Sequence, residues 1–333
     1  MQPRTIISAA VATLALSAPL AAASLTDTFT SFYVFGDSLS DDGSNVGLFT
    51  DGTVWATPIL DEFDAAGLDA RNFAHGGANL LTVSPEAIVL DMEEQIGAFA
   101  THLALNPDPT NTNMLASVWI GGNDVVPAVL GAYDSAASLF GFSSAVDLLA
   151  GAYKQSLEAL IGLGVDNFLV FDIPDVGDTP LVRRLTELNP PAPGELSLSQ
   201  GATLVTQAIN SAFDMVRDAI VDAAPDNAKP MFFEVSAFAL SDDLRSNPAL
   251  FGASAAGPCQ NVTFGGQVIQ LASGDPCSET TYWDGFHPTG NVHAFIETEV
   301  RSTLQPIPLP AAGWLLIGGL GGLALLRRRA ATA

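Results

Sequence analysis

Short apolar runs alternate with longer amphipathic stretches along most of this chain, and that alternation limits the folds open to it. The apolar runs are rich in β-branched and aromatic residues, which is typical of strands. They are Ser31–Phe35, Ala70–Phe73, Met114–Ile120, Asn167–Asp172 and Met231–Val235. The longer stretches predict helices, at Ser84–Leu103, Ser144–Leu163, Ser197–Ala223 and Asn291–Leu304. Strands joined by helices of this length form parallel βαβ units, so the sequence predicts an α/β fold, a three-layer α/β/α sandwich with a mostly parallel central sheet.

The N-terminal segment, residues 1–23, is typical of a secretory signal peptide. Arg4 precedes an apolar stretch without acidic residues, and Ala21 to Ala23 offer a small-residue cleavage site. A buried N-terminal helix is the alternative, and it leaves this placement of charge and small residues unexplained. We therefore expect an exported protein whose residues 24–305 form one domain. The proline-rich stretch Pro190–Gly194 predicts a surface loop, because the alternation of strands and helices resumes after it.

The C-terminal segment, residues 306–333, joins a proline motif at Ile307–Ala311 to an apolar run that ends at Leu326 and to three arginines, Arg327 to Arg329. The apolar run is shorter than the ~20 residues of a membrane-spanning helix, and the arginines would hold its end in the cytoplasm. The segment resembles the VPLPA-type and PEP-CTERM sorting tails of Gram-negative bacteria. That resemblance implies an exosortase-like processing protease as a partner and a place on the cell surface or outside the cell. A transmembrane anchor that stays attached is the alternative.

The net charge is strongly negative, −24, from 36 acidic and 12 basic residues. Residues 24–305 carry all the acidic residues and eight of the basic ones. A surface of this charge repels nucleic acid and anionic membranes, so we exclude a polyanion-binding role. The charge favours solubility and identifies no substrate.

The two cysteines, Cys259 and Cys277, both lie in the exported part. In an oxidising compartment we expect them to form a disulfide, which would stabilise the fold by ~3 kcal/mol. Free thiols and a metal site are weaker alternatives, since no His/Cys ligand set lies nearby. The four histidines lack metal-binding spacing, so we expect neither a metal nor another cofactor. The oxygen-rich segment Asn106–Asn113 lacks the spacing of a calcium loop and is more typical of a turn.

Four motifs fall at the ends of expected strands or in the last loop, where a parallel sheet collects the groups of its active site. They are FGDSLSD at Phe35–Asp41, NFAHGGAN at Asn72–Asn79, VWIGGND at Val118–Asp124 and YWDGFHPT at Tyr282–Thr289. Ser38 alone says little, because serine and aspartate before a helix commonly cap it. Together the four motifs resemble the SGNH hydrolases, also called the GDSL esterase/lipase family. The resemblance covers about residues 31–304. Where many relatives read D-S-L-S-D-T-G-N, this chain reads DSLSDDGSN from Asp37 to Asn45, with one extra residue before the asparagine.

The resemblance implies a role for each motif. Ser38 would be the nucleophile, His287 the general base, and Asp284 the group that orients the imidazole. The oxyanion hole would use the backbone N–H groups of Ser38 and Gly77 and the side-chain amide of Asn123. A neutral serine needs such a base, and imidazole is the side chain whose ordinary pKa suits the task.

The resulting expectation is an exported serine esterase or lipase that hydrolyses carboxylic esters, of lipids or short acyl chains, through an acyl-enzyme. An extracellular polysaccharide O-deacetylase is the alternative enzyme, and a non-catalytic surface or matrix protein the alternative from another class.

Three further histidines are expected to be structural. His75 lies close to the proposed site and is more typical of a satisfied strand-end residue than of a substrate contact. His293 is expected on the last helix, and His102 at the surface, away from every motif. The pair Tyr282 and Trp283 is expected either to line the acyl pocket or to cover the disulfide loop.

Overall fold

A computed structural model describes residues 24–81, 89–126, 142–264 and 267–305. The signal peptide and the C-terminal tail predicted from the sequence lie outside these ranges. Within them, no helix combines the length and the apolar character needed to cross a bilayer.

The core is a five-stranded sheet whose neighbouring strands are all parallel. Its strands are β1 (Ser31–Gly36), β2 (Asp69–Asn72), β3 (Met114–Trp119), β4 (Asn167–Phe171) and β5 (Met231–Val235), in the order β2-β1-β3-β4-β5. From β1 the chain first adds β2 on one side of that strand, and then adds β3, β4 and β5 in turn on its other side. The crevice above the carboxyl ends of β1 and β3 is therefore the switch point at which such sheets bind ligands.

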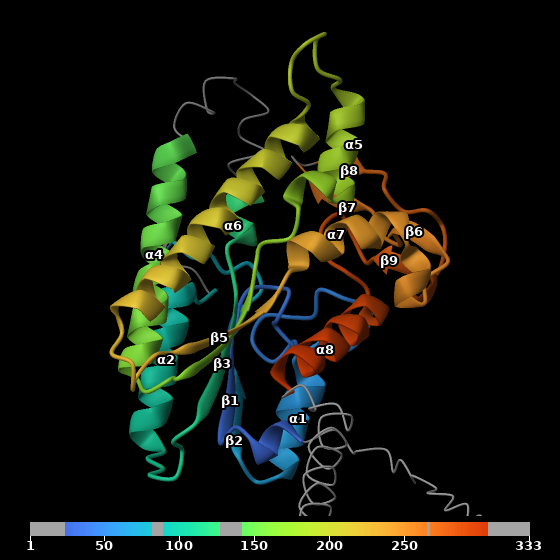
Figure 1. The fold of residues 1–333 in the computed structure, drawn as a ribbon. Coiled ribbons are helices and arrows are strands. Elements are labelled where there is room, and N and C mark those ends of the chain that lie inside the picture. The colour runs from blue at the N-terminus through green and yellow to red at the C-terminus, as the bar shows by residue number, and fades with distance from the viewer. Residues whose placement is uncertain (1–23, 82–88, 127–141, 265–266, 306–333) are drawn as a thin grey trace, which may run out of the picture.

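Helices cover both faces of the sheet, which confirms the predicted three-layer α/β/α sandwich (Figure 1). One face carries α2 (Met92–Leu105), α4 (Phe142–Gly162) and α6 (Leu198–Ala223), and the other carries α1 (Thr57–Ala65) and α8 (Gly290–Leu304). Successive side chains of a strand point to opposite faces. Tyr33 and Phe35 accordingly belong to one buried cluster, and Phe32 and Val34 to the other.

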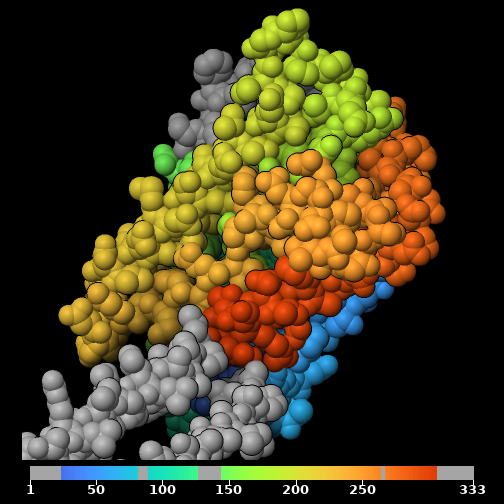
Figure 2. Space-filling view, turned by 45° about the vertical axis from the view of Figure 1, so that its right-hand side comes forward, coloured from blue at the N-terminus to red at the C-terminus, as the bar shows by residue number. Residues whose placement is uncertain are grey.

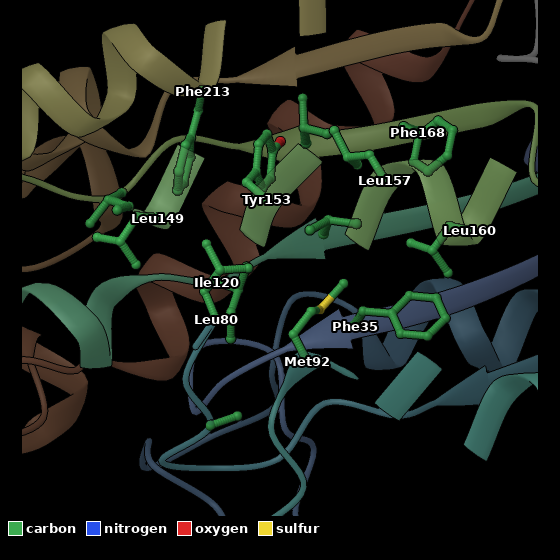
Figure 3. Packing of buried hydrophobic residues seen from close by; sticks show 14 of the residues in the cluster. Phe35, Leu80, Met92, Ile120, Leu149, Tyr153, Leu157, Leu160, Phe168 and Phe213 are labelled. Carbon is green, nitrogen blue, oxygen red and sulfur yellow. The ribbon is translucent and has the colours of Figure 1, made fainter. Parts of the chain in front are cut away.

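Figure 3 shows part of the first cluster, in which aromatic and aliphatic side chains from three helices meet those of the sheet. The Tyr153 and Phe213 rings, from α4 and α6, stack with their centroids 4.1 Å apart. Leu157 is fully buried beside them. The three inner strands β1, β3 and β4 are buried along their whole length because both faces of the sheet are covered.

Most of the shorter elements gather beyond the carboxyl edge of the sheet, and η1 (Leu25–Asp27) leads into β1 at the amino edge. Those beyond the carboxyl edge are η3 (Val176–Asp178), α5 (Pro180–Leu188), α7 (Ala237–Ser246), η4 (Pro248–Phe251), β6 (Ala255–Pro258), β7 (Val262–Phe264), β8 (Gln267–Ile269), η5 (Cys277–Glu279) and β9 (Thr280–Tyr282). Strand β6 pairs with β9, and β7 pairs with β8. A disulfide joins Cys259 to Cys277, with their Cα atoms 5.0 Å apart. These elements bring the last sequence motif over the end of the sheet.

Candidate active site

The nucleophile motif begins where β1 ends, at Gly36. Its φ is +154°, and a Cβ there would lie 2.2 Å from the carbonyl oxygen of Trp119, so only glycine fits. The side chain of Gln95, on α2, makes two hydrogen bonds to the backbone of Gly36. Its Oε1 accepts the Gly36 N–H at 2.9 Å, and its Nε2 donates to the Gly36 carbonyl at 2.8 Å. The chain then turns, and Ser38 lies at the edge of the sheet.

A continuous chain of hydrogen bonds links Ser38, His287 and Asp284. Ser38 Oγ lies 2.8 Å from His287 Nε2, and His287 Nδ1 lies 2.9 Å from Asp284 Oδ2. An ionised carboxylate only accepts hydrogen bonds, so Nδ1 carries the ring hydrogen. That leaves Nε2 free to accept the Ser38 hydroxyl proton. The structure thus brings together the three residues predicted as the nucleophile, base and orienting carboxylate, which are 249 residues apart at their extremes.

The Asp284 carboxylate is built into the loop that carries the histidine. Its Oδ1 accepts the backbone N–H groups of Phe286 and His287, each at 2.8 Å. Burial alone would raise the pKa of Asp284, but these bonds and the contact with His287 hold that pKa below its ordinary value. The carboxylate therefore stays ionised near neutral pH and fixes the imidazole orientation.

Three N–H donors predicted for the oxyanion hole lie around the serine motif. Among the described residues, no acceptor bonds the backbone N–H of Ser38 or of Gly77. Gly77 has φ +86°, a left-handed conformation that glycine adopts without strain. The amide nitrogen of Asn123 donates one hydrogen to the Ala78 carbonyl at 2.8 Å, which leaves its second hydrogen for a ligand.

Two carboxylates fasten the glycine loop to its neighbours. The fully buried Asp41 accepts the Gly76 N–H at 2.8 Å, and also the N–H groups of Gly43 and Val46. On the other side Asp124 accepts the N–H groups of Leu80 and Leu81, at 2.8 and 3.1 Å. Burial raises the pKa of Asp124 to about 6.

The one extra residue before Asn45 is accommodated in the loop after the nucleophile. Asn45 still reaches across the loop, and its amide donates to the Ala74 carbonyl at 2.8 Å. The Asp42 carboxylate bonds only within the loop, to Ser44. The departure from the family pattern therefore leaves the connection between the nucleophile and glycine loops in place.

Asp37 lines the cavity beside Ser38, and sequence reasoning gave it no role. It is 2 % exposed, and its Oδ1 accepts the Leu39 N–H at 3.0 Å. Burial raises the pKa of Asp37 to about 7, although that N–H and the nearby His287 act against the rise. Gln95 was missed in the same way, because its partner Gly36 is 59 residues away in the sequence.

A small cavity of about 110 Å³ opens beside Ser38. Its polar wall holds Asp37, Ser38, Asn123 and His287, and its apolar wall is made mainly by Leu39, Val126, Ile173, Pro174, Val176 and Phe286.

The other histidines lie away from this cavity. His75 is half-buried and its Nδ1 accepts the Leu90 N–H at 3.4 Å, and His293 is buried with its Nδ1 accepting the Trp55 N–H at 3.4 Å. The prediction that His102 is at the surface is wrong. Its side chain is 10 % exposed and its Nε2 lies 2.7 Å from Asp69 Oδ2, because this face of α2 packs against the end of β2.

The pair Tyr282 and Trp283 lies at the disulfide loop, and Tyr282 also lines two cavities. The Tyr282 carbonyl accepts the Cys259 N–H at 3.0 Å, and the Trp283 ring faces that of His287 with centroids 6.3 Å apart. Neither side chain lines the small cavity at Ser38. In the described residues, no group of three or more His, Cys, Asp and Glu side chains is placed to hold a metal ion.

The described fold and the order of the motifs agree with a known family. A model of the family described as GDSL-like Lipase/Acylhydrolase matches residues 32–300. The chain belongs to this family.

Three curated proteins are similar to parts of the chain. An acetylesterase of Thermothelomyces thermophilus is 31 % identical over 137 residues, which are 39 % of this chain and 43 % of that protein. Lipase 1 of Photorhabdus luminescens is 29 % identical over 177 residues, 51 % of this chain and 26 % of that protein. A phosphatidylcholine-sterol acyltransferase of Aeromonas hydrophila is 24 % identical over 178 residues, 46 % and 48 % of the two chains. The matches thus span less than half the length of each relative.

Two solved structures are similar over most of the chain, at low identity. The psychrotrophic esterase EstA from Pseudoalteromonas sp., inhibited by monoethylphosphonate, is 13 % identical with a TM-score of 0.37, and the match covers 83 % of this chain and 96 % of that one. The crystal structure of TesA is 16 % identical with a TM-score of 0.33, covering 82 % and 97 %.

Proposed function

We propose that this protein is a serine esterase that hydrolyses carboxylic esters of short acyl chains through an acyl-enzyme. The observation that carries the proposal is the hydrogen-bonded chain from Ser38 through His287 to Asp284, at 2.8 and 2.9 Å. The small cavity beside Ser38 supports a short acyl group over a long one.

The proposed reaction begins when Ser38 Oγ attacks the ester carbonyl carbon and its proton passes to His287 Nε2. The carbonyl oxygen becomes an oxyanion, which the N–H groups of Ser38 and Gly77 and the Asn123 amide would stabilise. The imidazolium lies against the Asp284 carboxylate, which stabilises its charge. The proton then goes to the leaving alcohol as the C–O bond breaks. A water molecule attacks the acyl-enzyme by the same steps and releases the acid.

The proposal is tested with p-nitrophenyl esters of increasing acyl length, from acetyl to palmitoyl. We expect kcat/KM to be highest for acetyl to butyryl esters and to fall for longer chains. The Ser38→Ala variant should lose nearly all of this activity, and Asp284→Asn should lower kcat by ~10²–10⁴ because the imidazole loses its charged partner. If folded Ser38→Ala hydrolyses the esters as fast as the unchanged protein, Ser38 is not the nucleophile.

We also propose that the protein is exported. This rests on the signal-peptide pattern of residues 1–23 and the sorting-tail pattern of residues 306–333, and a disulfide is typical of exported proteins. Expression in a Gram-negative host followed by N-terminal sequencing tests it. A mature N-terminus at Ser24 is expected, and an unprocessed Met1 in the cytoplasmic fraction would contradict it.

A further inference from the structure

A second and larger cavity lies outside the candidate active site, between α5, α7 and the segment that carries β6 and β9. Its volume is about 330 Å³, within the range of small-molecule sites. Figures 1 and 2 show α5 beside the segment of β6 to β8 at the upper right of the molecule. Three arginines line this cavity: Arg183, Arg184 and Arg245. Residues 24–305 contain only eight lysines and arginines, so the arginines are concentrated here in an otherwise acidic protein.

A carboxylate pairs with each of these arginines. Arg183 Nη1 lies 3.0 Å from Asp178 Oδ1, and Arg245 Nε lies 3.0 Å from the same oxygen. Arg184 pairs with Glu187 at 2.9 Å, and the exposed Asp242 is 3.6 Å from Arg245. The cavity lining itself holds three guanidiniums and two carboxylates, because Asp242 lies outside it.

Tyr282 also lines this cavity. The residue is 5 % exposed, and among the described residues no hydrogen bond uses its hydroxyl. Burial and the charges of Asp178 and Asp175 raise the pKa of Tyr282, while Arg183 and Arg245 act against the rise. The hydroxyl therefore stays protonated and can donate.

We propose that this cavity binds an oxyanion, which is a carboxylate, phosphate or sulfate carried by a polar molecule of about monosaccharide size. Guanidinium groups match the geometry of such oxyanions, and hydrogen bonds between charged groups are among the strongest in proteins. The Tyr282 hydroxyl supplies a further donor. The Gln270 side chain, also in the lining, can bond neutral hydroxyls of the same molecule.

The proposed anion site adjoins the candidate active site. Thr179 lines the cavity at Ser38, and the next residue, Pro180, lines the arginine cavity. The Leu181 N–H then donates to the Gly285 carbonyl at 3.1 Å, inside the loop that carries His287. A ligand bound by the arginines would lie beside the histidine loop. The anion-binding proposal does not depend on esterase activity.

Isothermal titration of the purified protein with glucuronate, glucose 6-phosphate, glucose 6-sulfate and glucose tests the proposal. At low salt we expect at least one charged sugar to bind and neutral glucose to give no measurable heat. The ranking of the three charged sugars identifies the oxyanion. Added salt should weaken binding, because the contact is ionic. If no charged sugar binds more tightly than glucose, the proposal is wrong.

Two variants locate the binding. Arg245→Gln removes one guanidinium while Arg183 still pairs with Asp178, and it should weaken binding about tenfold. Lys154→Gln is the matched control, since it removes one exposed positive charge on α4, which lies on the other side of the molecule from α5. Equal weakening by both variants would show a general charge effect and overturn the site.

Tyr282→Phe keeps the ring and removes only the hydroxyl. It is the second test if Arg245→Gln fails to fold. We expect it to weaken binding about threefold to tenfold while the unfolding temperature stays close to that of the unchanged protein. Unchanged affinity in both Tyr282→Phe and a folded Arg245→Gln protein would place any bound anion elsewhere. The same titrations on Ser38→Ala separate this result from a failure of the proposed esterase function, because binding at the arginines should survive there.

Discussion

At the residue scale, Asp37 shows how burial sets the charge of a group beside Ser38. The pKa of its carboxyl is raised to about 7 by burial, whereas in the unfolded chain it ionises near pH 4. Between these two values the folded protein holds a proton that the unfolded chain has released. The contribution of Asp37 to stability therefore falls as pH rises from about 4 to about 7.

The Asp37→Asn variant should accordingly be more stable than the unchanged protein at pH 8. The amide oxygen can still accept the Leu39 N–H, and no charge is buried. We expect the free energy of unfolding to rise by roughly 2–4 kcal/mol at pH 8 and to change little at pH 4. Urea unfolding at both pH values measures it, with the exposed Asp226→Asn as the control. A loss of stability at pH 8, or an equal gain at both pH values, would contradict the argument.

Single residues differ in how far the sequence predicts them. Asp284 and His287 lie three residues apart in one motif, so their pairing was predictable from a local pattern. Asp37 and Gln95 were not predicted. The roles of these two residues depend on burial and on backbone groups brought together by the fold, and no sequence pattern reports either.

At the scale of elements, Gln95 ties α2 to the end of β1. Its side chain makes hydrogen bonds to both the N–H and the carbonyl of Gly36 and to the carbonyl of Leu90, the last at 2.9 Å. Gln95 is fully buried, so none of these groups has water as a substitute. The turn that carries Ser38 therefore depends on a helix that contributes no group to the proposed chemistry.

Gln95→Met should destabilise the protein and lower its activity. Methionine has about the same length but leaves the buried Gly36 N–H without its partner and removes the donor to the Leu90 carbonyl, at about 1–3 kcal/mol for each, while the Gly36 carbonyl keeps the His75 N–H. We expect a loss of about 2–5 kcal/mol in urea unfolding. We also expect a lower kcat in the folded fraction, because the nucleophile turn shifts. Gln207→Met, at an exposed position of α6, is the control and should change neither. If both variants behave alike, Gln95 does not hold the turn.

The disulfide acts on the element that carries His287. From Cys259 a series of backbone bonds leads to the histidine: Cys259 N–H to the Tyr282 carbonyl at 3.0 Å, and Trp283 N–H to the His287 carbonyl at 2.8 Å. Replacing both cysteines by serine should lower the free energy of unfolding by ~3 kcal/mol. It should also reduce ester hydrolysis more steeply on warming, as the histidine loop loosens. Reducing the disulfide of the unchanged protein with a thiol should have the same effect as the double serine variant. If neither change alters the free energy of unfolding, the disulfide does not stabilise the fold.

The elements were predicted unequally for a physical reason. Each strand of the sheet was predicted to within about one residue. The strands β1, β3 and β4 are buried along their whole length, and such strands are mostly apolar. The helices α1, α5 and α7 have 9, 9 and 10 residues and were missed, since so few turns give little helical periodicity. Of the predicted helix Ser84–Leu103, residues 84–88 lie outside the described residues, and α2 begins at Met92, where Asp91 and Glu94 form a capping box.

At the scale of the whole molecule, the net charge of −24 opposes the compact state. Folding brings carboxylates closer together than they lie in the unfolded chain, and their repulsion lowers stability. Salt screens this repulsion, because the Debye length falls from ≈ 30 Å at 0.01 M to ≈ 10 Å at 0.1 M ionic strength. Few of the charges are compensated locally, since basic residues are outnumbered three to one.

The unfolding temperature should therefore rise with NaCl at neutral pH. If screening stabilises the folded protein by about 1–2 kcal/mol, the shift is roughly 2–8 °C for a domain of this size. Differential scanning calorimetry from low to moderate salt measures it, with sucrose of equal osmolarity to separate screening from exclusion effects. Near the isoelectric point, at about pH 4.1, many carboxylates are protonated and the salt effect should shrink. A rise of equal size at both pH values, or none at neutral pH, would mean that like-charge repulsion does not limit the stability of this fold.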